Sequence, residues 1–145
     1  MMSINNPLKI VVDTNVLLVS ILPRFSYYKI FEEIQSGKVN VYVSNDIVSE
    51  YTEVFSRRYT PHITEILLNT LFNLPNVFFV DPKFQWKLIE LDPDDNKFVD
   101  CAVASSVDYI ISNDRHFDIL KEIPFPKVTV LKAEEFIALI KIVNK

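Results

Sequence analysis

Short apolar runs alternate with amphipathic segments along the chain, and this alternation predicts strands that alternate with helices. Runs typical of buried strands occur at 8–12, 39–43, 77–80, 108–112 and 128–131. Apolar residues at helical spacing predict helices at 16–21, 25–34, 44–58, 61–73, 94–105, 113–120 and 133–143. This order predicts an α/β fold, in which helices cover both faces of a mostly parallel sheet of about five strands.

The length and composition of the chain fit a globular protein with its own core. We expect one domain over 1–145, with a flexible start over 1–7, because 145 residues can bury a core without disulfides. No apolar run reaches the roughly eighteen residues that a membrane span needs, and no secretion signal is evident. The single cysteine, Cys101, cannot form an internal disulfide. These features predict a cytoplasmic protein that has no membrane partner.

The scarcity of glycine and histidine excludes several enzyme classes. Gly37 is the one glycine, whereas a dinucleotide-binding loop, a Walker phosphate loop and a nucleophile elbow each need two or more. His62 and His116 are too far apart for the helical zinc-protease pair. The net charge of -4 disfavours a general nucleic-acid binder, but it allows a nuclease whose acids gather at a metal site.

Two predicted strands end in an aspartate that directly precedes a helix. Asp13 follows the strand 8–12, and Asp114 follows the strand 108–112. If both strands are central and parallel, the two carboxylates emerge at the same edge of the sheet, where α/β proteins bind their ligands. Two carboxylates about 5 Å apart repel by roughly 3 kcal/mol at an effective dielectric constant of 20. A divalent cation that prefers oxygen ligands, Mg²⁺ or Mn²⁺, would neutralise them, although each residue could instead cap its helix.

Further acids lie on two of the predicted helices. Glu50 is at the border of an apolar stripe, from which it can reach a strand end, although residues so placed are more often solvated. Asp95 is placed to cap its helix and to interact with the helix dipole. Asp100 has a solvent-facing position on the helical wheel, but its helix is apolar almost all round, and an acid on a buried helix needs a cation. The pattern leaves both roles of Asp100 open.

The order of these motifs resembles the PIN domain family, and more narrowly its bacterial branch of toxin–antitoxin toxin components, which is related to VapC-type toxins. The resemblance rests on VVDTNVLL, SNDIVSEYTEVF and DPDDNKFVDCAVASSVDYIISNDRHF, followed by a terminal strand and helix. It covers about 8–143. It implies a three-layer α/β/α fold and a metal-dependent endoribonuclease.

The resemblance also implies roles for single residues. The four family acids, which would be catalytic and bind Mg²⁺ or Mn²⁺, match Asp13, Glu50, Asp100 and Asp114. Supporting polar positions match Asn15, Asp95 and Ser112. The metal would lower the pKa of a bound water and so make a nucleophile, while Glu50 would bind metal through water or accept the proton. The implied partners are an RNA substrate, a cognate antitoxin and a second copy of the chain in a homodimer.

Contacts to substrate and rival functions are less sharply indicated by the sequence. Lys97 and Arg115 are candidates for gripping phosphate, Arg115 because it directly follows the fourth acid. A catalytically silent PIN-like module that binds a protein or RNA partner is the main alternative. The presence of all four acids argues against it, because a silent member would be expected to lose at least one. A receiver-type phospho-acceptor domain fits the motifs less well.

Overall fold

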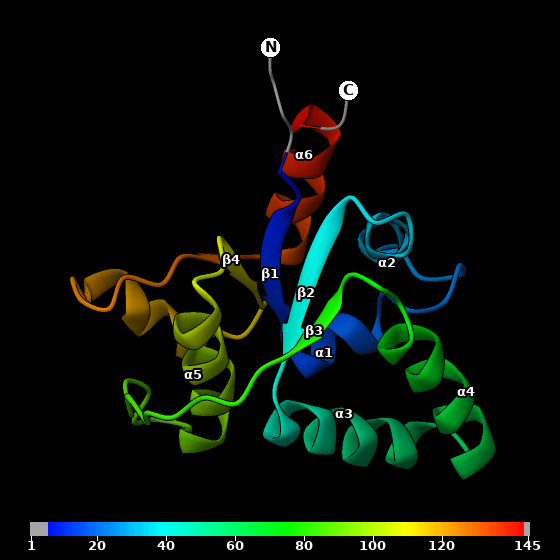
Figure 1. Cartoon of the computed structure of the whole chain (residues 1–145), viewed down its shortest axis with the longest axis horizontal. Coiled ribbons are helices and arrows are strands. Elements are labelled where there is room, and N and C mark those ends of the chain that lie inside the picture. The colour runs from blue at the N-terminus through cyan, green and yellow to red at the C-terminus, as the bar shows by residue number, and fades with distance from the viewer. Residues whose placement is uncertain (1–5, 144–145) are drawn as a thin grey trace.

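A five-stranded parallel sheet lies at the centre of the molecule (Figure 1). The structure is a computed structural model, and it describes residues 6–143. The strands are β1 (Leu8–Val12), β2 (Val39–Val43), β3 (Val77–Phe79), β4 (Tyr109–Ile111) and β5 (Val130–Leu131). They lie in the order β3-β2-β1-β4-β5, and every neighbouring pair is parallel. The predicted fold class is therefore confirmed.

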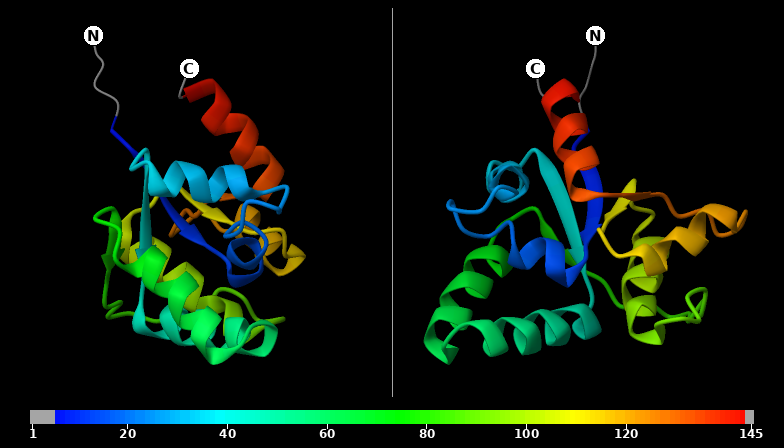
Figure 2. Two further views of the ribbon diagram at one scale, coloured as in Figure 1. Left: turned by 90° about the vertical axis from the view of Figure 1, so that its right-hand side faces the viewer. Right: turned by 180° about the vertical axis from the view of Figure 1, so that it is seen from behind.

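Helices cover both faces of this sheet, which gives three α/β/α layers (Figures 1 and 2). The helical segments are α1 (Thr14–Leu18), α2 (Tyr28–Gln35), α3 (Asn45–Arg58), α4 (Pro61–Phe72), η1 (Pro93–Asp95), α5 (Asn96–Ser105), η2 (Arg115–Glu122) and α6 (Ala133–Val143). α5 lies on one side of the sheet, and α1, α2 and α4 lie on the other. α3 crosses below the carboxyl ends of the strands, as Figure 1 shows.

Several boundaries differ from those that the pattern predicts. The predicted helix 25–34 begins at Tyr28, because a turn precedes it in which the N–H of Tyr28 donates to the carbonyl of Phe25 at 3.1 Å. The predicted helix 94–105 is divided into η1 and α5. Of the predicted flexible start, residues 1–5 lie outside the part of the chain that the structure describes. Within 6–143, no helix has the length and apolar character that crossing a bilayer requires.

The middle of the sheet is buried on both faces. Ile10, Val11 and Val12 of β1 have exposed fractions of 0–1%, so this strand is apolar at consecutive positions, as expected for a central parallel strand. On the α5 side, Phe98 and Phe117 pack with their rings nearly edge-on, 6.4 Å apart. This packing holds α5 and η2 against the end of the sheet where the acidic residues lie.

One buried hydroxyl ties α3 to the central strand. Tyr51 has no exposed surface, and its hydroxyl donates to the backbone carbonyl of Val12, directly before Asp13. We expect Tyr51→Phe to lower the free energy of unfolding by about 1–2 kcal/mol, because the buried carbonyl loses its side-chain donor. Urea denaturation measures this change. The control is Tyr28→Phe, which removes an exposed hydroxyl and should stay within about 0.5 kcal/mol of the wild type. Equal losses in the two variants would contradict the role of Tyr51.

Candidate metal centre

The parallel pairing of β1 with β4 brings the first and fourth predicted acids to one edge of the sheet. Val12 is in register with Ile111, and the N–H of Asp13 donates to the carbonyl of Ile111 at 2.9 Å, one step beyond the strand. The hydroxyl of Ser112 donates to Asp13 Oδ2 at 2.7 Å, and the N–H of Asp114 donates to Ser112 Oγ at 3.0 Å. Ser112 therefore links the two acids and orients the carboxylate of Asp13.

Glu50 reaches the same edge from α3. Its Oε2 accepts a hydrogen bond from the hydroxyl of Thr14, the residue that follows Asp13. Its Oε1 lies 2.7 Å from Lys97 Nζ, and both side chains of this ion pair are less than one-fifth exposed. The two contacts hold Glu50 beside Asp13, close enough for its charge to raise the pKa of the Asp13 carboxyl.

A fourth acid, Asp95, approaches from the end of η1. It is 8% exposed, and the charges of Asp92, Asp13 and Asp114 act on its carboxyl group. Asp92, Asp95, Asp114 and His116 can each offer one ligand atom, and these four atoms lie within 4.8 Å of one another. Asp95 was predicted as a supporting residue only, whereas the structure places its Oδ2 3.6 Å from His116 Nδ1 and in one group of possible ligand atoms with the strand-end acid Asp114.

The sequence did not predict Asp92 and His116 as possible metal ligands. His116 Nδ1 lies 3.4 Å from Asp114 Oδ1, 3.6 Å from Asp95 Oδ2 and 3.6 Å from Asp92 Oδ2. The short spacing from Asp114 to His116 was visible in the sequence, but the meeting of this segment with the segment before α5 was not. That meeting depends on how the loop before η1 folds back over the sheet edge.

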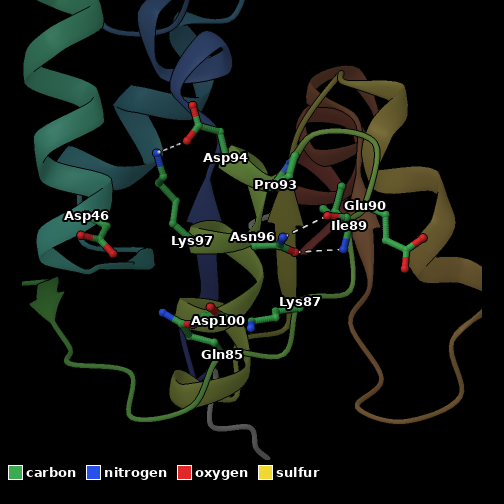
Figure 3. A pocket seen from close by; sticks show the side chains of 10 residues that line it. All are labelled: Asp46, Gln85, Lys87, Ile89, Glu90, Pro93, Asp94, Asn96, Lys97 and Asp100. Carbon is green, nitrogen blue, oxygen red and sulfur yellow. Dashed lines mark hydrogen bonds and ion pairs between the residues drawn. The ribbon is translucent and has the colours of Figure 1, made fainter.

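The structure does not bring Asp100 into this group. Its Oδ1 accepts a hydrogen bond from the backbone N–H of Trp86 at 3.0 Å. Figure 3 shows Asp100 beside Gln85 and Lys87, in a pocket of about 580 Å³ along α5. Asp95 ends η1 directly before α5, and five residues rotate a helix by about 140° beyond a full turn, so Asp100 points in a different direction from Asp95. Burial raises the pKa of Asp100, the bond from Trp86 opposes this, and the neighbouring charge is that of Asp46.

The remaining predicted residues occupy less central positions. Asn15 is exposed in the first turn of α1, and Arg115 is exposed at the start of η2. Lys97 has its ammonium group between Glu50 and Asp94, at 2.7 Å and 3.8 Å, and the contact with Asp94 is drawn in Figure 3. Lys97 thus lies beside the acids, and its positive charge compensates the negative charge of Glu50.

Burial, with the neighbouring carboxylates, raises the pKa values of Asp13 and Asp95, the two most buried acids of this group. Burial raises the pKa of Asp13 to about 6, with further upward effects from Glu50 and Asp114 and an opposing hydrogen bond from Ser112. Burial raises the pKa of Asp95 to about 7, with upward effects from Asp92, Asp13 and Asp114, which His116 opposes. The protein therefore holds several acids in a place that disfavours their negative charges.

These residues fit a divalent cation. Oxygen ligands from carboxylates are what Mg²⁺ and Mn²⁺ prefer, and a cation would offset the repulsion among them. Asp95 Oδ2 is buried and lacks a hydrogen-bond partner within the described residues, as expected for an atom that a metal would satisfy. Asp13, Asp95 and Asp114 could hold such an ion, and Glu50 could reach it directly or through water.

Comparison with known proteins identifies the family. The family model described as PIN domain matches residues 9–116, so the chain belongs to the PIN domain family. The fold resembles that of a chain in the crystal structure of VapBC2 from Rickettsia felis bound to a DNA fragment from their promoter. The match has a TM-score of 0.61 at 14% sequence identity, and covers 86% of this chain and 98% of that one. No curated protein sequence matches the chain. The predicted family and fold are thereby confirmed.

The raised pKa values predict how pH changes the stability of the metal-free protein. The ordinary pKa of an aspartate is 3.8, whereas Asp13 and Asp95 titrate at about 6 and about 7 in the native state. The native state thus binds more protons than the unfolded chain between about pH 4 and pH 7, and stability falls as the pH rises through this range. In EDTA, we expect the melting temperature to fall between about pH 5 and about pH 8.

A double variant isolates the effect of these two carboxyls from all other titrations. Asp13→Asn combined with Asp95→Asn removes both groups, so the fall in melting temperature with rising pH should become smaller than in the wild type. An equal or larger fall in the double variant would contradict the assignment.

Proposed function

We propose that the protein is a divalent-metal-dependent endoribonuclease and the toxin of a toxin–antitoxin pair. The observation that carries this proposal is the convergence of Asp13, Glu50, Asp95 and Asp114 at the carboxyl ends of β1 and β4 in a PIN domain. A group of oxygen ligands without a nucleophilic side chain among them suits hydrolysis by an activated water.

Each acid has a distinct role in this proposal. Asp13, Asp95 and Asp114 would hold Mg²⁺ or Mn²⁺, and the ion would supply Lewis acidity toward a scissile phosphate and lower the pKa of a water bound to it. Ser112 keeps the carboxylate of Asp13 in place through its 2.7 Å hydrogen bond. Glu50, which Thr14 and Lys97 hold beside Asp13, binds metal through water or accepts a proton.

Two basic residues serve substrate binding in the same proposal. Lys97 lies at 2.7 Å from Glu50, so its ammonium group can turn to a substrate phosphate while staying beside the acids. Arg115 is exposed directly after Asp114, where it can contact a substrate phosphate. Asn15 stays a predicted supporting residue on the exposed side of α1.

The biological setting is proposed from the structural relative. The Rickettsia felis structure is a VapBC2 complex bound to promoter DNA, which supports a small antitoxin as a partner for this chain. A homodimer and a cytoplasmic location stay predictions from the sequence. Purification of the chain together with the product of the neighbouring reading frame tests the antitoxin partner.

The first test concerns the anchoring acid. Asp13→Asn keeps the size of the side chain and removes its charge, so we expect cleavage of single-stranded RNA with Mn²⁺ or Mg²⁺ to fall at least about a hundredfold. The fold should survive, because the lost charge is one that burial disfavours. Cleavage of defined RNAs and the melting temperature in EDTA measure the two effects.

The matched control for this variant is an exposed acid nearby. Asp118→Asn changes the charge equally on the surface of η2 and should cleave within about threefold of the wild type. Undiminished cleavage by Asp13→Asn would exclude the carboxylate mechanism. A wild type that cleaves no RNA with either metal would favour the silent module instead.

A second test decides whether Asp95 or Asp100 acts as the third family acid at the metal centre. Asp95 lies with Asp13 and Asp114, whereas Asp100 bonds to the backbone of Trp86. We therefore expect Asp95→Asn to lower the rate of RNA cleavage at least about a hundredfold, and Asp100→Asn to lower it less than about fivefold. A larger loss of cleavage rate in Asp100→Asn than in Asp95→Asn, measured in the same assay, would identify Asp100 as the third family acid.

A further inference from the structure

Two side chains of the candidate metal centre, Asp92 and His116, have no role in the proposed nuclease mechanism, and His116 is the one that offers a nitrogen. His116 presents Nδ1 to three carboxylates, those of Asp92, Asp95 and Asp114, at 3.4–3.6 Å. Carboxylates alone would hold Mg²⁺, so hydrolysis by the family acids does not require an imidazole. The position of this nitrogen therefore needs its own explanation.

The local backbone fixes the imidazole over the acids. Asp114 caps η2, and its Oδ1 accepts the backbone N–H of His116 at 2.9 Å. This bond turns the chain so that the side chain of His116 lies near the carboxylate of Asp114. The cap of η2 thus keeps the backbone of His116 beside Asp114, and the ring nitrogen Nδ1 lies 3.4 Å from Asp114 Oδ1.

The contacts of this nitrogen are too long for direct hydrogen bonds to the acids. Charge-assisted N–H···O bonds have lengths of about 2.7–2.9 Å, whereas the three contacts of His116 Nδ1 are 3.4–3.6 Å. Among residues 6–143, Nδ1 is buried without a hydrogen-bond partner, and so is Asp95 Oδ2, which lies 3.6 Å from it. Asp95 is 8% exposed, so a deeply buried carboxylate oxygen points at an equally unsatisfied nitrogen.

The spacing of these atoms suits ligands of one cation. Two atoms that each lie about 2.1 Å from an octahedral ion are about 3 Å apart when adjacent and about 4.2 Å apart when opposite. The contacts of His116 Nδ1 lie between these values, and the four possible ligand atoms lie within 4.8 Å of one another. A small inward movement of the carboxylates would close the site around an ion.

We propose that His116 Nδ1 is a metal ligand, together with Asp92, Asp95 and Asp114, and that the site consequently takes Mn²⁺ in preference to Mg²⁺. Imidazole nitrogen is a common ligand of first-row transition metals, whereas Mg²⁺ takes oxygen ligands and usually keeps several waters. The inference deepens the proposed nuclease function by naming its cation and rests on that function. It shares Asp95 and Asp114 with the ligands proposed there, and it adds Asp92 and His116.

The test reads the nitrogen directly, with Mn²⁺ as the probe. Electron spin-echo envelope modulation of the full chain loaded with Mn²⁺ should show ¹⁴N coupling, which His116→Phe removes because this variant keeps a ring without a donor atom. Calorimetry should show the affinity for Mn²⁺ falling at least about tenfold in this variant, and the affinity for Mg²⁺ changing less than about threefold.

The other histidine of the chain supplies the matched control. His62 is exposed on α4, so His62→Phe should keep both the ¹⁴N coupling and the affinities of the wild type. The absence of ¹⁴N coupling in wild-type protein with bound Mn²⁺ would overturn the proposal, and this spectrum needs no variant to fold. An unchanged ratio of the two affinities in a folded His116→Phe variant would overturn it as well.

The outcomes separate this inference from the proposed function. Nitrogen coupling in a protein that cleaves no RNA would support the ligand and contradict the nuclease. Metal-dependent RNA cleavage without nitrogen coupling would support the nuclease and contradict the ligand.

Discussion

The pairing of β1 with β4 is the constraint on which the candidate site depends. Because the two strands are parallel and Val12 is in register with Ile111, the residues that follow them emerge side by side. The backbone bond from Asp13 to Ile111 extends this pairing by one residue, and Ser112 then connects the carboxylate of Asp13 with the backbone of Asp114. A slip of one residue would turn every side chain of a strand to the other face, so the buried core of β1 and the geometry of the site are specified together.

The electrostatics of this edge follow from how few cations the chain supplies there. Lys97 compensates Glu50 at 2.7 Å, whereas Asp13 and Asp95 keep raised pKa values because burial and neighbouring acids both disfavour their charges. A divalent cation would reverse this balance, since it binds the native state and stabilises it by its own binding free energy. Folding stability and metal affinity are therefore expected to be coupled at this edge.

The segment before α5 shows how a loop can select one acid among several. The side-chain amide of Asn96 donates to the carbonyl of Ile89 and its oxygen accepts the N–H of Ile89, both at 2.9 Å, which fastens the loop to the start of α5. Asp95 is then directed to the strand ends, whereas Asp100, farther along the helix, receives the backbone of Trp86. Asp95 and Asp100, two acids of one motif, therefore have different surroundings. For this reason the proposed third metal ligand is Asp95 and not Asp100.

The sequence by itself determined the order of strands and helices, the family and the two strand-end acids. Periodicity is a local property, and an acid after a buried strand lies at a sheet edge whichever strands become neighbours. Only the tertiary structure decided that Asp95 lies with Asp13 and Asp114, and that Asp92 and His116 join them. The reason is physical: these contacts join segments separated in the chain, and they depend on loop conformation and helix rotation, which short-range patterns do not encode.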